Sequence, residues 1–156
     1  IGKRCSLGQN VNVSNHVKVG DGCKLQNNVS LYEGVELEDY VFCGPSCVFT
    51  NDLTPRAKYP KGSAGYHKTL VKEGASIGAN ATVVCGHMVG KWALIGAGAV
   101  VASNVPDHAL MLGVPAKQAG WVCKCGAVLH FDGVRAVCTA CGRSYAKNEE
   151  NQIEER

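Results

Sequence analysis

The sequence contains no apolar run approaching the roughly 20 residues that a membrane-spanning helix needs. It also lacks a basic run: 16 Lys and Arg stand against 13 Asp and Glu, a scattered net charge of +3 that is too small for a nucleic-acid-binding surface. The N-terminal segment lacks the charged and apolar regions of a secretory signal. We therefore expect a soluble, cytoplasmic protein that binds neither membranes nor nucleic acids.

A length of 156 residues accommodates one main domain with, at most, a small stapled module. Nine cysteines would suggest disulfides in a secreted protein, but the odd number and the lack of a signal favour reduced thiols, some of them on a metal. Because the chain begins with Ile1 and not with Met, we expect that N-terminal residues are missing.

Aliphatic residues recur every six positions in two blocks. They are Ile1, Leu7, Val13, Val19, Leu25, Leu31 and Leu37, and then Val71, Ile77, Val83, Val89, Ile95 and Val101, with Cys43 continuing the first block. A small or β-branched residue follows four positions later at Cys5, Val11, Val17, Cys23, Val29, Val35, Val41, Cys47, Ala75, Ala81, Ala93, Ala99 and Val105. Only His87 breaks this second series.

Fourteen such repeats match neither a helix nor a simple alternating strand. Glycine follows the aliphatic residue at seven positions, where a tight corner between short strands favours a residue without Cβ. Three six-residue sides form one coil, with successive coils stacked about 4.8 Å apart. The pattern therefore predicts an all-β, parallel β-helix of four to five coils.

The two blocks of repeats are separated by an insertion. The interval from Cys43 to Val71 is not a multiple of six positions, so an external loop over about 51–70 must leave the β-helix and rejoin it. The loop is rich in basic residues, namely Arg56, Lys58, Lys61, His67 and Lys68. Long loops on rigid scaffolds are often functional, and a merely tolerated insertion is the alternative.

Over residues 1 to about 117 the repeats resemble the hexapeptide-repeat acyltransferases. This resemblance implies a left-handed β-helix and a homotrimer with sites between subunits. The segment GVPAK, residues 113–117, resembles the motif that closes the β-helix in these enzymes. It implies that Lys117 contacts the phosphates of coenzyme A, the alternative being a solvated surface lysine.

The run CGPSCVFTNDLTPRA and the segment QNNVSLYEG resemble a narrower group, the nucleotide-sugar 3-N-acetyltransferases. Some members act on UDP-linked 3-amino uronic acids, to which this chain is more similar, and others on dTDP-linked 3-amino-dideoxy sugars. The resemblance implies transfer of an acetyl group from acetyl-CoA to a 3-amino group, in synthesis of surface-polysaccharide precursors such as those of lipopolysaccharide. An amine attacks a thioester readily once it is neutral, so a strong general base is not obligatory.

The predicted site residues each have a plainer alternative. Asn51 matches the Asn of the F-T-N segment and is expected to hold the sugar amine or a neighbouring hydroxyl, or else simply to form a turn. His67 and His87 are candidate bases; the alternatives are a solvated loop residue for His67 and a packed core residue for His87. The acceptor candidates, which are otherwise exposed corner residues, are Asn28, Tyr32, Glu33, Arg56 and Lys68. The donor candidates, whose alternative is corner geometry, are Ala79, Asn80, Gly86 and Gly98, together with Lys117.

Four cysteines near the C-terminus predict a second module. Cys123 and Cys125 are separated from Cys138 and Cys141 by twelve residues, which indicates a small zinc ribbon over residues 121–146, after a β-helix domain of residues 1–120. Four thiolates would close a structural Zn²⁺ site and leave no open position for catalysis. The first pair is C-x-C and not the usual C-x-x-C, so free or disulfide-bonded thiols remain the alternative. Residues 147–156 are predicted to be a disordered polar tail.

Three rival functions could use the same kind of scaffold. A γ-type carbonic anhydrase needs three histidine ligands including a close pair, and His67 and His87 are twenty residues apart. An O-acetyltransferase with a histidine base is a better alternative. A non-catalytic β-helix scaffold would need neither the basic loop nor the GVPAK segment.

Overall fold

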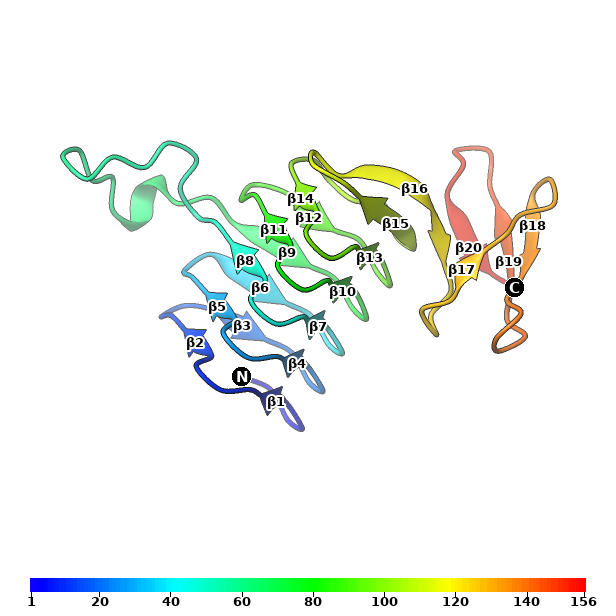
Figure 1. The fold of residues 1–156 in the computed structure, drawn as a ribbon, viewed down its shortest axis with the longest axis horizontal. Helices are drawn as coiled ribbons and strands as arrows, with labels where there is room; N and C mark the ends of the chain where they lie inside the picture. Colours follow the sequence, from blue (N-terminus) through cyan, green and yellow to red (C-terminus); the bar gives the residue numbers. More distant parts are fainter.

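The computed structural model describes residues 1–156 and shows a parallel β-helix followed by a small antiparallel sheet (Figure 1). Three stacks of short strands form the sides of the β-helix, which we name faces A, B and C. Face A contains β1 (Ser6–Leu7), β4 (Lys24–Leu25), β7 (Phe42–Cys43), β10 (Ser76–Ile77), β13 (Leu94–Ile95) and β15 (Ala109–Leu112). Face B contains β2 (Asn12–Val13), β5 (Ser30–Leu31), β8 (Val48–Phe49), β11 (Thr82–Val83) and β14 (Val100–Val101). Face C contains β3 (Lys18–Val19), β6 (Val35–Leu37), β9 (Thr69–Val71) and β12 (Met88–Val89).

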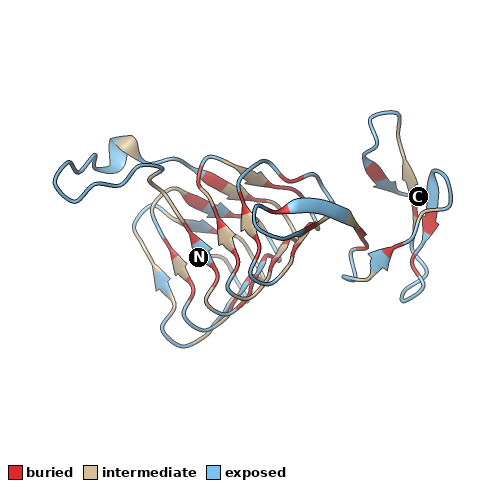
Figure 2. Cartoon of the chain, turned by 45° about the horizontal axis from the view of Figure 1, so that its top comes forward, coloured by how far each residue is buried: buried red, intermediate tan, exposed pale blue.

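Strands pair in parallel with a partner one full coil further along the chain, as in Ser6 with Lys24 and Asn12 with Ser30. In each two-residue strand from β3 onward the second residue is buried and the first is more exposed, as the colours of Figure 2 show along the chain. The predicted six-residue core is therefore confirmed from Val19 onward, whereas Ile1 and Leu7 of the same series are exposed at the N-terminal end of the β-helix. Phe49, which lies one period beyond Cys43, also belongs to this series and is fully buried.

The corners between faces show a second six-residue rhythm. Left-handed backbone recurs at Arg4, Asn10, His16, Gly22, Asn28, Gly34, Tyr40 and Ser46, and again at Gly74, Asn80, Gly86, Trp92 and Gly98. The glycines that follow the aliphatic residues lie two positions earlier and have a different role. At Gly78 a Cβ atom would lie 2.5 Å from the backbone nitrogen of Ala97 in the next coil. Close approach between coils, more than the turn itself, therefore requires these glycines.

The basic loop leaves the β-helix at the corner between faces B and C, which we call the BC edge (Figure 1). It contains one short helix, η1 (Ser63–Gly65). The backbone N–H of His67 donates to the carbonyl of Asn51 at 2.8 Å, so the two ends of the loop meet at a narrow neck. The strands on either side, β8 and β9, keep their partners in the coils before and after the loop. The insertion thus leaves the ladder of coils intact.

The C-terminal region extends face A. β15 pairs in parallel with β13 and is the sixth parallel strand of that face. The β-helix is therefore longer than the predicted four to five coils. The chain then reverses into β16 (Lys117–Val122), which pairs with β15 and with β17 (Val128–Leu129).

A separate sheet contains β18 (Arg135–Val137), β19 (Ser144–Lys147) and β20 (Ile153–Glu155). The prediction that the chain is disordered after Lys147 is wrong, because β20 pairs with β19 and Ile153 is buried. A single buried aliphatic residue in a polar segment gave too little periodicity to reveal this strand. None of the helical structure is long or apolar enough to traverse a bilayer.

Replacing Gly78 by Ala tests the close approach between coils. The added methyl would overlap the backbone of the next coil, so we expect the free energy of unfolding to fall by about 1–3 kcal/mol. Gly120→Ala is the matched control, because a Cβ there meets no atom within 4 Å. Denaturant titration of both variants measures the difference, and equal stabilities would contradict the explanation.

Candidate functional site

A hollow of about 360 Å³ lies on the BC edge, at the neck of the loop. Its walls are formed by Ser14, Asn15, Tyr32, Glu33, Asn51 and Tyr66. The structure therefore brings together three of the predicted residues: Asn51, Tyr32 and Glu33. The first four of these lining residues come from two consecutive coils, and the last two come from the ends of the loop. We call this hollow the neck pocket.

Asn51 is held at the neck pocket by both its backbone and its side chain. Its carbonyl accepts from His67, and its Nδ2 lies 3.5 Å from the carbonyl oxygen of Glu33. The carboxylate of Glu33 accepts a hydrogen bond of 3.1 Å from the hydroxyl of Ser63 in the loop. These contacts attach the loop to the coils and place an amide and a carboxylate beside one open hollow.

The two candidate bases also lie on the BC edge. His67 is exposed at the neck, two residues before β9 begins at Thr69, and a Cβ atom on Gly86 would lie 3.9 Å from the Cβ of His67. His87 follows Gly86 and is half-buried, so the alternative of a packed core residue does not describe it. The larger imidazole remains at the corner, whereas Ala81 and Ala93 at the equivalent positions are buried. No hydrogen bond orients either imidazole ring within this chain.

The remaining basic loop residues lie outside the lining of the neck pocket. Arg56 is exposed and donates only to the carbonyl of Pro55, at 3.2 Å. Lys68 is exposed, and its carbonyl accepts from the N–H of Gly86. Lys61 instead braces the loop, because its ammonium group contacts Asp52 at 2.5 Å and lowers the pKa of that carboxyl.

The donor candidates lie mostly on another corner, the AB edge between faces A and B. Ala79 and Asn80 occupy one coil, and the N–H of Gly98 in the next coil donates to the carbonyl of Ala79 at 2.9 Å. Lys117 stands at the C-terminal end of this edge, exposed and paired across β15 and β16 with Leu112. Two predicted residues fall elsewhere. Gly86 lies on the BC edge, and Asn28 lies on the AB edge with left-handed backbone, away from the neck pocket.

The four predicted ligand cysteines converge in the C-terminal module. Their sulfur atoms all lie within 4.8 Å of one another, with 3.4 Å between Cys123 and Cys141 and 3.6 Å between Cys125 and Cys138. Gly126 and Gly142 follow the two pairs in left-handed conformation, and each N–H returns to a cysteine carbonyl at 2.8 Å. We call this group the four-cysteine cluster.

The electrostatics of the four-cysteine cluster favour thiolate at Cys141 but not at Cys125, where the backbone hydrogen bond of Ala127 is outweighed by hydrogen bonds with Cys123 and Cys138, which raise the pKa to about 12. Hydrogen bonds from the backbone N–H and the guanidinium of Arg143 lower the pKa of Cys141 to about 6. Thiolate is the form that binds metal ions. The arrangement could therefore hold one metal ion between four sulfur atoms.

Four residues around the neck pocket were not predicted: Ser14, Asn15 and Tyr66 in its walls, and Ser63 behind Glu33. Ser14 and Asn15 lie one coil before Tyr32 and Glu33, so the coil period itself could have identified them. Ser63 and Tyr66 lie in the aperiodic loop, where no sequence pattern shows which side chains return to the coils.

Comparison with known proteins gives the same architecture. A family model described as hexapeptide repeat of succinyl-transferase matches residues 1–33 and 72–103. A dTDP-3-amino-3,6-dideoxy-alpha-D-galactopyranose 3-N-acetyltransferase from Aneurinibacillus thermoaerophilus is 48% identical over 80 residues, which are 51% of this chain and 41% of that protein. The chain thus spans less than half of the length of this relative.

Two solved structures share the fold. The first is a hexapeptide-repeat acetyltransferase from Vibrio cholerae O1 biovar eltor, complexed with acetyl coenzyme A, with a TM-score of 0.66 at 22% identity. The superposition covers 78% of this chain and 69% of the Vibrio chain. The second is a mutant of the N-acyltransferase AntD from Bacillus cereus, in complex with dTDP and coenzyme A, with a TM-score of 0.58 at 15% identity. The superposition covers 77% of this chain and 82% of the AntD chain. The repeats, the stacked coils and these similarities show that the chain shares its β-helix fold with these two acyltransferase structures.

Proposed function

We propose that this chain transfers the acetyl group of acetyl-CoA to the 3-amino group of a nucleotide-linked amino sugar. The observation that carries the proposal is the neck pocket, where Asn51 and Glu33 meet at the foot of the loop. The 48% identity to a dTDP-3-amino-sugar 3-N-acetyltransferase supports the substrate class. A dTDP-linked or a UDP-linked 3-amino sugar would fit the same proposal.

The two groups of candidate residues lie on different edges of one chain, and both edges border face B. The outward side chains of this face carry no charge; they are Asn12, Ser30, Val48, Thr82 and Val100. We propose that face B is turned toward a three-fold axis in a homotrimer. Around such an axis the AB edge of one copy lies beside the BC edge of the next, so each site combines a donor edge and an acceptor edge.

The chemistry assigned to the pocket follows from an amine acceptor. The neutral amine attacks the thioester carbonyl carbon, the oxyanion intermediate collapses, the C–S bond breaks, and the amine proton leaves as the thiol forms. Asn51 is proposed to hold the amine in line for attack, which is a gain in orientation. Neither His67 nor His87 is oriented by a hydrogen bond, which fits a reaction that needs no strong general base.

We assign donor binding to Ala79, Asn80 and Gly98, whose small or exposed side chains let an extended pantetheine arm approach the backbone of the AB edge. Lys117 at the end of this edge is the proposed contact for the phosphates. Gly86 is better explained by the corner next to His67.

We further propose that the four-cysteine cluster holds one structural Zn²⁺. In a tetrahedral site with Zn–S bonds of about 2.3 Å, neighbouring sulfur atoms lie about 3.8 Å apart. The separations of 3.4 and 3.6 Å are close to this spacing, and the thiolate character of Cys141 suits metal binding. Cys123 and Cys138 are buried, so four sulfur ligands would close the site and exclude a catalytic role.

Acetyl transfer should be measured as thiol release from acetyl-CoA with UDP- and dTDP-linked 3-amino sugars and the matching 3-hydroxy sugars. We expect turnover of at least one amino sugar and none of the hydroxy sugars. His67→Ala and His87→Ala should each retain most of this activity. Turnover of a hydroxy sugar that either substitution abolishes would instead establish O-acetyl transfer with a histidine base.

Substitution of Asn51 separates its two possible roles. Asn51→Asp preserves a turn-forming side chain but replaces the neutral amide acceptor with a carboxylate that favours the unreactive ammonium form of the acceptor, whereas Asn51→Ala removes both the amide acceptor and the turn-forming side chain. If the amide positions the amine, both variants should lose about 100-fold in kcat/KM. An active Asn51→Asp variant beside an inactive, less stable Asn51→Ala variant would mean that the residue only forms the turn.

Metal analysis of the purified protein should find one zinc per chain. Cys141→Ser should reduce the metal content to below one half and lower the melting temperature, because the small C-terminal sheet then loses a ligand. Cys5→Ser is the control, since this thiol lies outside the cluster and a hydroxyl can keep its contact with the carbonyl of Gly20. Full zinc content in the Cys141→Ser variant would refute the assignment of that ligand.

A further inference from the structure

A single strand joins the end of the donor edge to the four-cysteine cluster. β16 begins at Lys117 and ends at Val122, and the next residue is the ligand candidate Cys123. The register between β15 and β16 shifts between Leu110 and Met111. Only two pairs, those of Lys117 and Gln118, lie on the Lys117 side of the shift. The position of Lys117 therefore depends on how firmly the other half of β16 is bound.

The other half of β16 is held to the last coil by its pairs with Ala109 and Leu110 of β15 and, at its very end, by His108. The N–H of Val122 donates to the carbonyl of His108 at 2.8 Å, and the His108 Nδ1 lies 2.9 Å from the carbonyl of Val122. The N–H of His108 in turn donates to the carbonyl of Lys91 in the preceding coil at 2.7 Å. His108 is buried, so these contacts are shielded from water. One residue thus binds both the N–H and the carbonyl of the residue next to the cluster.

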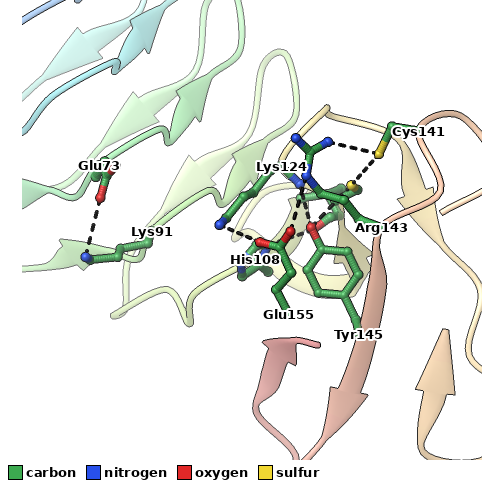
Figure 3. Close-up of polar contacts among 10 residues, drawn as sticks. Glu73, Lys91, His108, Lys124, Cys141, Arg143, Tyr145 and Glu155 are labelled. Atoms are coloured by element: carbon green, nitrogen blue, oxygen red, sulfur yellow. Dashed lines mark hydrogen bonds and ion pairs between the residues drawn. The ribbon is translucent and has the colours of Figure 1, made fainter. Parts of the chain in front are cut away.

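The cluster itself continues this network (Figure 3). The hydroxyl of Tyr145 lies 3.3 Å from the sulfur of Cys123 and accepts from the N–H of Lys124 at 3.1 Å. The Tyr145 ring packs edge-on against His108, with 5.3 Å between ring centroids. Glu155 pairs with both Lys124 and Arg143, at 2.5 and 3.3 Å. Tyr145 therefore contacts both Cys123 in the cluster and His108 in the last coil.

We propose that metal binding at the four-cysteine cluster sets the affinity of this protein for coenzyme A, with β16 and His108 as the connection. The inference rests on the donor-site role proposed for Lys117. With the metal bound, Cys123 is fixed, Val122 remains between its two His108 contacts, and β16 presents Lys117 in one position. Without the metal, the small sheet has little apolar core to hold it, so Cys123 and Tyr145 no longer hold the Val122 end of β16 against His108, and the pairs with β15 alone keep that end in place. Lys117 is then spread over several positions and contributes less to phosphate binding.

The chain carries its own reporter of this connection. Its only two tryptophans are both at the junction: Trp121 is buried in β16, and Trp92 lies under the ammonium group of Lys124, 5.7 Å from its ring centroid. Detachment of the C-terminal sheet should expose both indole rings to water. Tryptophan fluorescence should then shift to longer wavelength on metal removal, independently of any activity.

The test is the dissociation constant of coenzyme A, measured by calorimetry for the zinc-loaded full chain and for the same protein after chelation. We expect binding to weaken about tenfold on zinc removal, within the usual range of coupling between two sites. Lys117→Ala should weaken binding by the loaded protein, and further zinc removal should then have little additional effect. Lys24→Ala, an exposed lysine at the start of β4 on the same face, is the matched control and should behave as wild type.

His108→Ala tests the connection without altering a ligand or Lys117. This variant should still bind one zinc, yet its coenzyme A affinity and tryptophan fluorescence should resemble those of metal-free wild type. Equal affinity with and without zinc, or a zinc-loaded His108→Ala variant that binds coenzyme A like wild type, would overturn the proposed connection while the proposed function stands. A zinc-loaded wild-type protein that does not bind coenzyme A would overturn both.

Discussion

The hydrogen-bonded stacking of each coil on the next is the constraint on which the whole structure depends. A two-residue strand has no partner within its own coil, so its N–H and C=O groups must pair with residues one coil away. This requirement locks the length of every coil and makes the coil cross-section uniform. It also explains why the interior consists mainly of aliphatic or small residues, with Phe49 as a larger member, and why Gly78 must lack a side chain. Each coil is therefore stable only through its contacts with the neighbouring coils.

A scaffold of this kind leaves its corners as the places where chemistry can vary. The loop that begins at Asn51 leaves from a corner and returns to the same corner, so β8 and β9 lose no pairing. Side chains one coil apart, such as Asn15 and Glu33, lie next to each other in the wall of the pocket, simply because the coils stack. The neck pocket combines this regular wall with the irregular loop. Two edges bordering an uncharged face offer the proposed acceptor and donor halves of a shared site.

The C-terminal module is integrated with the β-helix more closely than a tethered domain would be. β16 belongs to the sheet of face A and also leads into the four-cysteine cluster. His108, a corner residue of the last coil, accepts from Val122 through its backbone carbonyl and contacts the Val122 carbonyl through its ring, and Tyr145 joins it to Cys123. The burial of this junction explains the lowered pKa of His108. The four-cysteine cluster and the end of the β-helix are therefore parts of one packed unit.

By itself, the sequence determined the features that follow from local periodicity. The six-residue series placed the interior residues, the break after Cys43 placed the loop, and the spacing of Cys123 to Cys141 brought the four thiols to one cluster. The coil period also places Asn28 and Asn51 on different edges, once it is applied to the corners. Only the tertiary structure decided where the aperiodic segments lie: it brought Tyr66 from the loop to the neck pocket and ordered β20 beside β19. The physical reason is that coil periodicity depends on nearest neighbours in the stack, whereas loop return, sheet pairing in the small module and the contact of His108 with Val122 depend on packing between distant segments.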